Sequence, residues 1–327
     1  MTKTASAPIT NLHVARDDDF SAAVLEGLGA SPKRLYPRLL YDERGSRLFE
    51  RICEQPEYYV TRVEMEVLRL EGRKIIDALD GEVDLIELGS GNSMKTRIIL
   101  DHLSDRQGHF EYRPIDISEE ILRKTSQEIQ ADYPNISVHG FVADFLAGLE
   151  FLKLKTSRQR LILFLGSNLG NFEYGEALEF LKQIRRGAVT GDWILLGIDM
   201  DKDPAVIEGA YNDAAGFTRE FMLNLLDRIN RELGGDFDRS GFQFRAEYNQ
   251  AGQRMEIGVL SRRKQKVFLE EMDRTIRFSR GEWIEMEVSC KYTPGRLQWL
   301  LREAGLQTVR QVSDSRGWFT LNLCRVP

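Results

Sequence analysis

The chain has 327 residues, of which 42% are hydrophobic and 29% are charged, so it has the composition of a folded protein with one large domain or two of moderate size. Its formal net charge is −6 with acids and bases interspersed, which argues against nucleic acid as a partner because phosphate binding needs a concentrated basic surface. No apolar run suits a membrane span and the N-terminus lacks the apolar segment of a secretory signal, so we expect a cytoplasmic protein without a membrane partner.

Cysteine and histidine indicate neither a disulfide framework nor a metal centre. The three cysteines are odd in number and widely spaced, and the four histidines show no ligand spacing. We therefore expect no metal cofactor, and we treat the chain as a monomer.

Along the chain, residues 1–62 begin with a short polar tail and are rich in helix signals. Near-continuous apolar strands then alternate with amphipathic helices as far as residue 200. This rhythm predicts an α/β fold with a parallel sheet covered on both faces, and with ligands beyond the carboxyl ends of its strands. The predicted strands are 83–88, 110–116, 137–142, 161–165 and 193–199, and the predicted helices are 93–104, 118–131 and 173–186.

The first of these strands ends abruptly in Gly89-Ser90-Gly91 and a helix follows. Small residues at such a turn let the backbone approach a ligand closely, and the helix start adds free N–H donors. A dinucleotide fingerprint requires a third glycine where this chain has Met94, and Glu87 just before the turn is expected to repel a phosphate. The string E-L-G-S-G instead resembles the first motif of S-adenosylmethionine methyltransferases; an ordinary strand-to-helix turn is the alternative.

Acidic residues follow the next two strands. Asp116 ends the strand 110–116, 25 residues after Gly91, where nucleoside-binding folds place an acid on the ribose hydroxyls. Asp144 and Phe145 follow the third strand, where an acid and a ring can receive an adenine. Each acid alone can equally be a surface residue after a strand, but the three elements in this order favour a nucleoside cofactor.

After residue 201 the alternation ends. We predict two helices over residues 204–233, an antiparallel sheet over 242–279, another helix over 295–305, and two closing strands around a turn over 307–326. The predicted domains are therefore 63–200 with 291–327, interrupted by a second domain of 1–62 with 201–290.

Several unusual strings occur in a fixed order: YDERGSRLFERICEQPEYYVTR (41–62), IELGSGNSMKTR (86–97), FLGSNLGNF (164–172), YNDAAGFTREF (211–221), INRELGGDFD (229–238) and MEVSCKY (286–292). Together they resemble the histidine-specific methyltransferase family, from about residue 22 to the C-terminus. Its best-known member makes hercynine, the Nα,Nα,Nα-trimethyl betaine of L-histidine, in ergothioneine biosynthesis. Related fungal enzymes methylate tryptophan-derived amines.

The resemblance implies a Rossmann-like seven-stranded methyltransferase sheet with an inserted α+β substrate-binding domain. It implies S-adenosylmethionine as methyl donor and a small amino acid, L-histidine, as acceptor. The family's cofactor site falls on Gly89, Lys95, Asp116, Asp144 and Phe145, and its amino-acid site falls on Tyr58, Asn171, Tyr211, Glu287 and Ser289.

Chemistry gives these residues roles. Asn171 and Tyr211 can donate to a substrate carboxylate, and Tyr58, the catalytic candidate, lies by the amine in the resemblance. Glu287 and Ser289 are two apart on a predicted strand, so they share a face and can grip both imidazole nitrogens. The tyrosines can alternatively be core residues, Asn171 a helix cap, and the last pair a solvent-facing strand.

Two positions depart from the family pattern. Ile257 stands where the histidine enzyme has a methionine near the imidazole, and Asn168 replaces a small hydroxylated residue. Neither excludes histidine. Two other readings stay open: the same chemistry on another amino acid or small amine, and a non-catalytic cofactor-binding protein.

Overall fold

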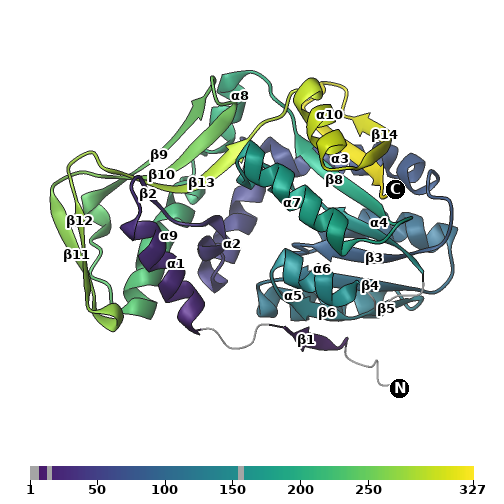
Figure 1. The fold of residues 1–327 in the computed structure, drawn as a ribbon, viewed down its shortest axis with the longest axis horizontal. Helices are drawn as coiled ribbons and strands as arrows, with labels where there is room; N and C mark the ends of the chain where they lie inside the picture. The colour runs from purple at the N-terminus through teal and green to yellow at the C-terminus, as the bar shows by residue number, and fades with distance from the viewer. Residues whose placement is uncertain (1–6, 13–16, 154–157) are drawn as a thin grey trace. The chain divides into compact units, whose positions relative to one another are not determined.

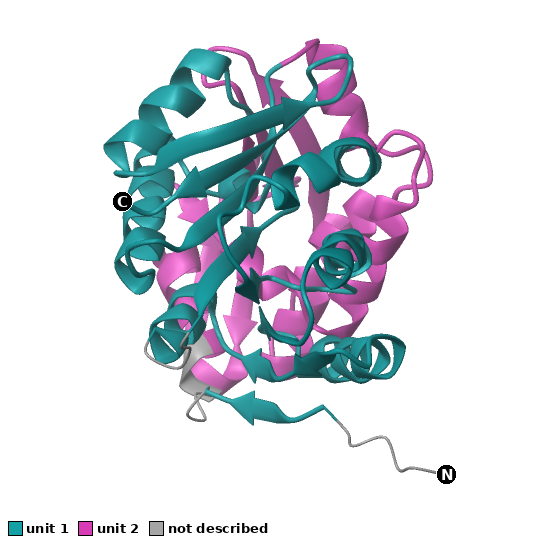
Figure 2. Ribbon diagram, turned by 90° about the vertical axis from the view of Figure 1, so that its right-hand side faces the viewer, with its two compact units in different colours: residues 1–14, 60–201, 291–327 teal, residues 15–59, 202–290 magenta. Residues whose placement is uncertain are grey.

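The computed structural model describes residues 7–12, 17–153 and 158–327, and for residues 17–19 it describes the backbone alone. The chain forms two compact units, shown in different colours in Figure 2. The large unit comprises residues 1–14, 60–201 and 291–327, and the small unit comprises residues 15–59 and 202–290. Within the described ranges, no helix combines the length and apolar character that crossing a membrane requires.

A nine-stranded sheet forms the centre of the large unit (Figure 1). Its order is β1-β6-β4-β3-β7-β8-β15-β14, with β5 also paired to β4. β15 is antiparallel to both of its neighbours, β8 and β14, and the other pairs are parallel. The strands are β1 (Ile9–Asn11), β3 (Val83–Leu88), β4 (Phe110–Asp116), β5 (Ile136–Val138), β6 (Gly140–Val142), β7 (Gln159–Phe164), β8 (Trp193–Asp199), β14 (Gln307–Ser313) and β15 (Phe319–Arg325).

Helices connect these strands and bury their apolar stripes against the sheet. Strand β3 is buried along its whole length and β8 likewise, as a parallel sheet with helices on both faces requires. The helices are α3 (Tyr59–Ile76), α4 (Met94–Arg106), α5 (Glu119–Asp132), α6 (Phe145–Leu152), α7 (Tyr174–Gly187) and α10 (Pro294–Glu303), with a 3-10 turn η2 at Asn168–Asn171.

The direction of strand addition reverses beside β3. From β3 the chain proceeds outward through β4 to β6, and then returns to add β7 and β8 on the other side. Such a switch point leaves a crevice beyond the carboxyl ends of the two central strands, where open α/β sheets bind ligands. We therefore expect a ligand-binding site at the turns that follow β3 and β7.

The structure adds two strands to the predicted seven. Residues 9–11 were expected to belong with the inserted domain, but β1 pairs in parallel with β6 at the edge of the large sheet. Three residues are too few to show a strand period, and the partner strand lies about 130 residues away, so a pattern along the chain does not predict this pairing. The predicted strand 137–142 is divided at His139, next to Gly140, whose added Cβ would lie 2.6 Å from Ile9 Cδ1.

The small unit contains a four-stranded sheet of order β2-β13-β10-β9, a two-stranded ribbon β11-β12, and helices. Its strands are β2 (Lys33–Arg34), β9 (Phe242–Asn249), β10 (Arg254–Ser261), β11 (Gln265–Leu269), β12 (Arg274–Phe278) and β13 (Trp283–Cys290). Its helices are α1 (Asp17–Gly29), α2 (Glu43–Cys53), α8 (Pro204–Ala210) and α9 (Phe217–Leu233), with 3-10 turns η1 (Pro37–Leu40), η3 (Arg239–Gly241) and η4 (Glu270–Met272).

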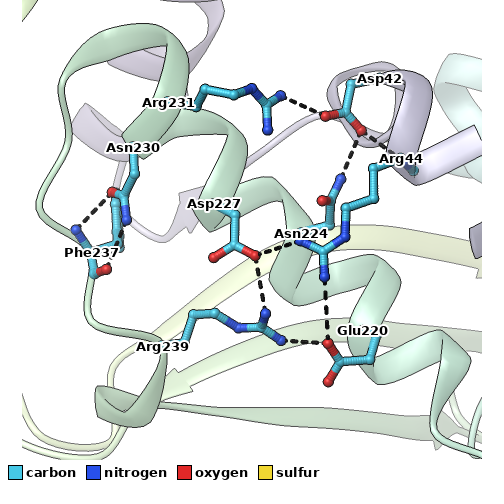
Figure 3. Close-up of polar contacts among 10 residues, drawn as sticks. Asp42, Arg44, Glu220, Asn224, Asp227, Asn230, Arg231, Phe237 and Arg239 are labelled. Atoms are coloured by element: carbon cyan, nitrogen blue, oxygen red, sulfur yellow. Dashed lines mark hydrogen bonds and ion pairs between the residues drawn. The ribbon is translucent and has the colours of Figure 1, made fainter.

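Asp42 ties helices α2 and α9 together (Figure 3). Its carboxylate caps α2 by accepting from the Gly45 N–H (2.7 Å), and it also accepts from the Asn224 amide and the Arg231 guanidinium of α9, each at 2.7 Å. Burial opposes ionisation, but these donors hold the pKa of Asp42 below its usual value. The first string of the family resemblance therefore encodes a helix cap that also joins a second helix.

A buried ion pair closes the large unit where the chain leaves it and returns. Lys291 Nζ lies 2.7 Å from Asp199 Oδ2, and both side chains are fully buried. Beside them, Met200 forms a bridge with Tyr292, and the Asp201 N–H donates to the Tyr292 carbonyl (3.0 Å). The departing and returning strands are thus fastened to each other within the large unit.

Removing the charge of Lys291 should strongly destabilise the protein, because it leaves Asp199 as an unpaired buried carboxylate. We expect Lys291→Met to lower the free energy of unfolding by about 3–5 kcal/mol, measured by urea denaturation. The double variant Asp199→Asn/Lys291→Met should recover much of that loss. Arg302→Ala, which removes the exposed pair with Glu303, is the control and should cost about 1 kcal/mol or less. An equal cost for both single variants would contradict this account.

Candidate functional site

The turn after β3 takes a backbone path that favours glycine. Gly89 and Gly91 have φ angles of 77° and 49°, in the left-handed region where side chains are strained. A Cβ on Gly89 would lie 3.2 Å from the Phe145 ring, whereas one on Gly91 would meet nothing within 4 Å. Within the described residues, the buried Ser90 hydroxyl has no hydrogen-bond partner. The turn thus combines open space with a buried polar atom that a ligand can satisfy.

Asp116 lies beside this turn at the carboxyl end of β4. The Gly91 N–H donates to Asp116 Oδ2 (2.9 Å), and the Ser118 N–H donates to Oδ1 (2.9 Å). Burial raises the pKa of Asp116, while these backbone donors oppose the rise. The structure therefore brings together Gly91 and Asp116, which are 25 residues apart in the sequence, and two backbone N–H groups hold the Asp116 carboxylate beside the glycine turn.

Asp144 and Phe145 begin helix α6. Asp144 is exposed and caps the helix, accepting from the N–H groups of Leu146 (3.0 Å) and Ala147 (2.9 Å). Phe145 faces the space that the absent Gly89 side chain leaves and packs edge-on against Phe164 (5.4 Å between centroids). Phe145 thus lies next to the glycine turn, and Asp144 caps helix α6 whether or not it also contacts a ligand.

Glu87 lies under the turn, where the sequence led us to expect a carboxylate facing the ligand. One oxygen accepts from Thr96 and the other from Tyr112, each at 2.5 Å, and the side chain is buried. Burial raises its pKa to about 7, against the effect of these hydrogen bonds. Its role is to support the turn from below, so the argument against a dinucleotide rests on Met94 instead.

Lys95, in the first turn of α4, is held by a residue that sequence reasoning missed. Its ammonium donates to Glu64 Oε2 of helix α3 at 2.8 Å. The Glu64 carboxylate also accepts from the Gly166 N–H, in the turn after β7, at 2.9 and 3.0 Å. Glu64 lies in α3, three residues after Thr61. Acidic residues of helices are usually exposed, so the sequence does not indicate that Glu64 is buried.

Asn171 ends the 3-10 turn η2 after β7, at the same edge of the sheet as the glycine turn. Helix α7 is capped by Glu173, which forms a reciprocal capping box with Glu176. The alternative in which Asn171 caps this helix is therefore wrong. Asn171 is half-buried.

In the small unit, three of the predicted residues lie together. The Tyr211 hydroxyl donates to Ser289 Oγ at 2.7 Å, and the Tyr58 ring meets the Tyr211 ring edge-on at 6.2 Å. All three side chains are buried. Burial, with Tyr211 next in effect, raises the pKa of Tyr58 well above its usual value, so it stays a neutral hydroxyl.

Glu287 extends this group along β13. It is half-buried, and its charge is among those that raise the pKa of Tyr58. Strand pairing sets Glu287 opposite Ile257 and Ser289 opposite Met255. Ile257, the position that departs from the family pattern, is thus the cross-strand neighbour of Glu287 on the same face of the sheet.

Two further tyrosines flank the group. Tyr41 packs edge-on against Phe49 and Phe221, with ring centroids 5.6 and 5.4 Å apart. The Tyr59 hydroxyl accepts from Lys202 at 2.8 Å. The aromatic positions Phe49 and Phe221 were not singled out from the sequence, because apolar residues at helical spacing indicate a core.

A sheet of this order, with a glycine turn after β3 and an acid at the end of β4, is typical of the Rossmann-like methyltransferase class of α/β proteins. A family model described as histidine-specific, S-adenosylmethionine-dependent methyltransferase matches residues 20–326. The chain belongs to this family.

Its relatives include two mycobacterial enzymes and a longer fungal protein. The chain is 39% identical to the histidine N-alpha-methyltransferase of Mycolicibacterium smegmatis, and 38% identical to that of Mycobacterium tuberculosis, over 92% of each chain in both comparisons. It is 33% identical to ergothioneine biosynthesis protein 1 of Neurospora crassa, over 86% of this chain and 32% of that protein.

The raised pKa of Glu87 predicts a pH dependence of stability. An ordinary glutamate has a pKa near 4.5, so between there and about 7 the unfolded chain has released a proton that the folded protein retains. Folded stability therefore falls as pH rises through this window. Relative to Glu87→Gln, the free energy of unfolding of the unmodified protein should fall by about 2–3 kcal/mol between pH 5 and pH 7. Denaturation curves of both proteins across this range provide the measurement, and parallel profiles would show that Glu87 is ionised throughout.

Proposed function

We propose that this protein methylates the α-amine of L-histidine with S-adenosylmethionine, in successive transfers that lead to the trimethyl betaine hercynine. The family match over residues 20–326, which spans both units, carries this proposal. When bound, the donor supplies an electrophilic methyl group on a sulfonium sulfur. We further propose that the large unit holds the donor and that the small unit supplies most contacts to the acceptor.

The residues of the large unit suit the donor. Gly91 leaves open space beside the turn, and the buried Ser90 hydroxyl is available to a ligand. Asp116 is fixed by two backbone N–H groups, which leaves its remaining lone pairs for the ribose hydroxyls. Phe145 offers a ring for the adenine, and Asp144 accepts from the adenine amino group in this assignment.

Neutral donors suit the acceptor's carboxylate. Asn171 is not used as a helix cap, so its amide is assigned to the substrate carboxylate. Tyr211 is assigned to the same carboxylate, and to donate there its hydroxyl must turn its proton away from Ser289 Oγ when the substrate binds. Neutral donors fix a carboxylate without a permanent ion pair.

The amine needs a partner that tolerates replacement of N–H by methyl. Free amino acids carry a proton on this amine at neutral pH, and the ammonium has no lone pair for attack. The Tyr58 hydroxyl stays neutral because its pKa is raised, so it orients the amine rather than removing a proton. Either the neutral amine binds, or its proton leaves to water near Tyr58. Positioning of the lone pair then accounts for most of the catalysis.

Glu287 and Ser289 are assigned to the imidazole ring. A carboxylate and a hydroxyl on one face match a ring with two nitrogens, and a side chain that cannot hydrogen-bond leaves a half-buried charge unpaired. Ile257, opposite Glu287, forms an apolar wall of similar size to methionine.

The direct test incubates the protein with L-histidine and S-adenosylmethionine and follows products by mass spectrometry. We expect histidine to gain one, two and then three methyl groups, with S-adenosylhomocysteine formed in equal amount to the methyls transferred. Nα,Nα-dimethylhistidine should also be converted, because the last transfer needs only the final lone pair.

Parallel reactions with other amino acids and with tryptophan-derived amines separate the alternatives. Methylation of one of these in place of histidine would keep the chemistry and overturn the substrate. Donor binding without any product would indicate a cofactor-binding protein.

Glu287→Ala should lower the preference for histidine over tryptophan by about tenfold or more, because it removes the charged partner of the ring. The ratio of kcat/KM values for the two amino acids provides the measurement. Glu256→Ala is the matched control: this residue lies on the neighbouring strand opposite Val288, hence on the other face, and binds Arg254 and Asn249. An unchanged ratio in the Glu287 variant would contradict the assignment.

A further inference from the structure

Glu64 is a fully buried carboxylate for which the proposed chemistry has no direct use. It lies on α3, and none of its side chain is exposed. Its contacts are the Lys95 ammonium and the Gly166 N–H described above. A charge this deep is costly unless it is paired and hydrogen-bonded, so this arrangement needs a reason.

The sheet makes room for this carboxylate by lacking a side chain in the middle of β8. A Cβ added to Gly197 would lie 2.2 Å from Glu64 Oε1. Glycine in a strand interior weakens the strand, and it often marks the close approach of another group. Gly197 therefore provides the space that the Glu64 carboxylate occupies.

Lys95 in turn lies against the turn after β7. A Cβ on Gly166, whose φ is 78°, would lie 2.9 Å from Lys95 Nζ and 3.6 Å from Asn168 Nδ2. The same Asn168 atom is 3.5 Å from a Cβ built on Gly89. The Lys95 ammonium and the glycine turn after β3 therefore both lie near the Asn168 side-chain amide, at the switch point of the sheet.

The strand order separates the groups suited to the ribose of the donor from those suited to its amino-acid end. Asp116 ends β4 on one side of β3, whereas Gly166 and Lys95 lie at the end of β7 on the other side. If the ribose lies toward β4, the amino-acid end of the donor extends toward β7, where an ammonium suits its carboxylate. The Lys95 side chain is 24% exposed, so a ligand can reach it while Glu64 beneath stays covered.

We propose that Glu64 is a positioning residue that fixes the Lys95 ammonium and the Gly166 turn to receive the carboxylate of the methyl donor. This inference rests on the proposed donor and adds a residue to its site. A lysine has a long flexible side chain, and an ion pair with a buried carboxylate sets its ammonium in one place before the ligand arrives. Gly197 has a part in this arrangement, because any larger residue there displaces the carboxylate.

The test compares two ligands that differ only at the amino-acid end. S-Adenosylhomocysteine carries the carboxylate, whereas 5′-methylthioadenosine keeps the nucleoside and sulfur but lacks the amino-acid group. We expect Glu64→Gln to weaken S-adenosylhomocysteine by about 10- to 100-fold in calorimetry, with the affinity for 5′-methylthioadenosine changed less than about twofold. Gly197→Ala, which keeps both charges, should give the same selective loss. Glu71→Gln is the matched control, on the same helix in an ion pair with Lys74, and should change neither affinity.

Equal weakening of both ligands in the Glu64 and Gly197 variants would show a merely structural role and overturn the proposal. Unchanged affinities would also overturn it. Because these are binding measurements, they do not depend on which amine is methylated: a selective loss supports the role of Glu64 even if histidine is not the acceptor. If the unmodified protein bound neither ligand, the donor itself would be wrong, and this inference would fall with it.

Discussion

The ion pair between Asp199 and Lys291 is the contact on which the organisation of this protein depends. The chain leaves the large unit after Asp201 and returns at Lys291, and the two buried charges, 2.7 Å apart, join these two points. Because either charge alone would be costly in the interior, the departing and returning segments must both be in place when the sheet forms. The pairing of Met200 with Tyr292 then fixes their register. Residues 202–290 therefore begin and end at a closed stem.

That stem is continuous with the proposed donor site through β8. Asp199 ends this strand, and Gly197, two residues earlier, faces the Glu64 carboxylate. Three glycines mark the places where other groups come close: Phe145 at Gly89, Lys95 at Gly166 and Glu64 at Gly197. Absent side chains therefore shape this end of the sheet as much as the groups that line it. Two of the three also have positive φ angles, which adds a backbone reason for glycine.

The sequence predicts the bounds of strands best where both faces of a strand are buried. Strands Val83–Leu88, Phe110–Asp116 and Trp193–Asp199 were predicted to the residue, because each is rich in apolar residues and ends either before a glycine or at an aspartate. The glycine turn and Asp116 could be located for the same reason, since both follow such strands. Helix α6, only eight residues long, was missed.

Glu64 and Glu87 show why the rest could not be predicted. Both are acids, and a local pattern places acids at the surface or toward a ligand. Glu64 is buried because Gly197, more than 130 residues later, leaves room for it. Glu87 can be buried because the hydroxyls of Tyr112 and Thr96 donate hydrogen bonds to its carboxylate. Such placement depends on tertiary contacts, which spacing along the chain does not encode. The same limit applies to Ser289, whose link to Tyr211 crosses 78 residues.

The pairing of β10 with β13 determines where Glu287, the residue proposed to bind the imidazole ring, lies on its sheet. Ile257 pairs with Glu287, but the next residue, Gly258, pairs with Glu285, so Met286 is the extra residue of a β-bulge. The bulge requires glycine, because a Cβ at position 258 would lie 2.1 Å from the Ile284 carbonyl oxygen. The bulge changes the register of the two strands directly beside Glu287. Positions 257 and 287 then form one wall, in a unit separate from the sheet that carries Gly89 and Asp116. Under the proposed assignments, substitutions at these two positions change which side chain is accepted without altering the residues proposed to bind the donor.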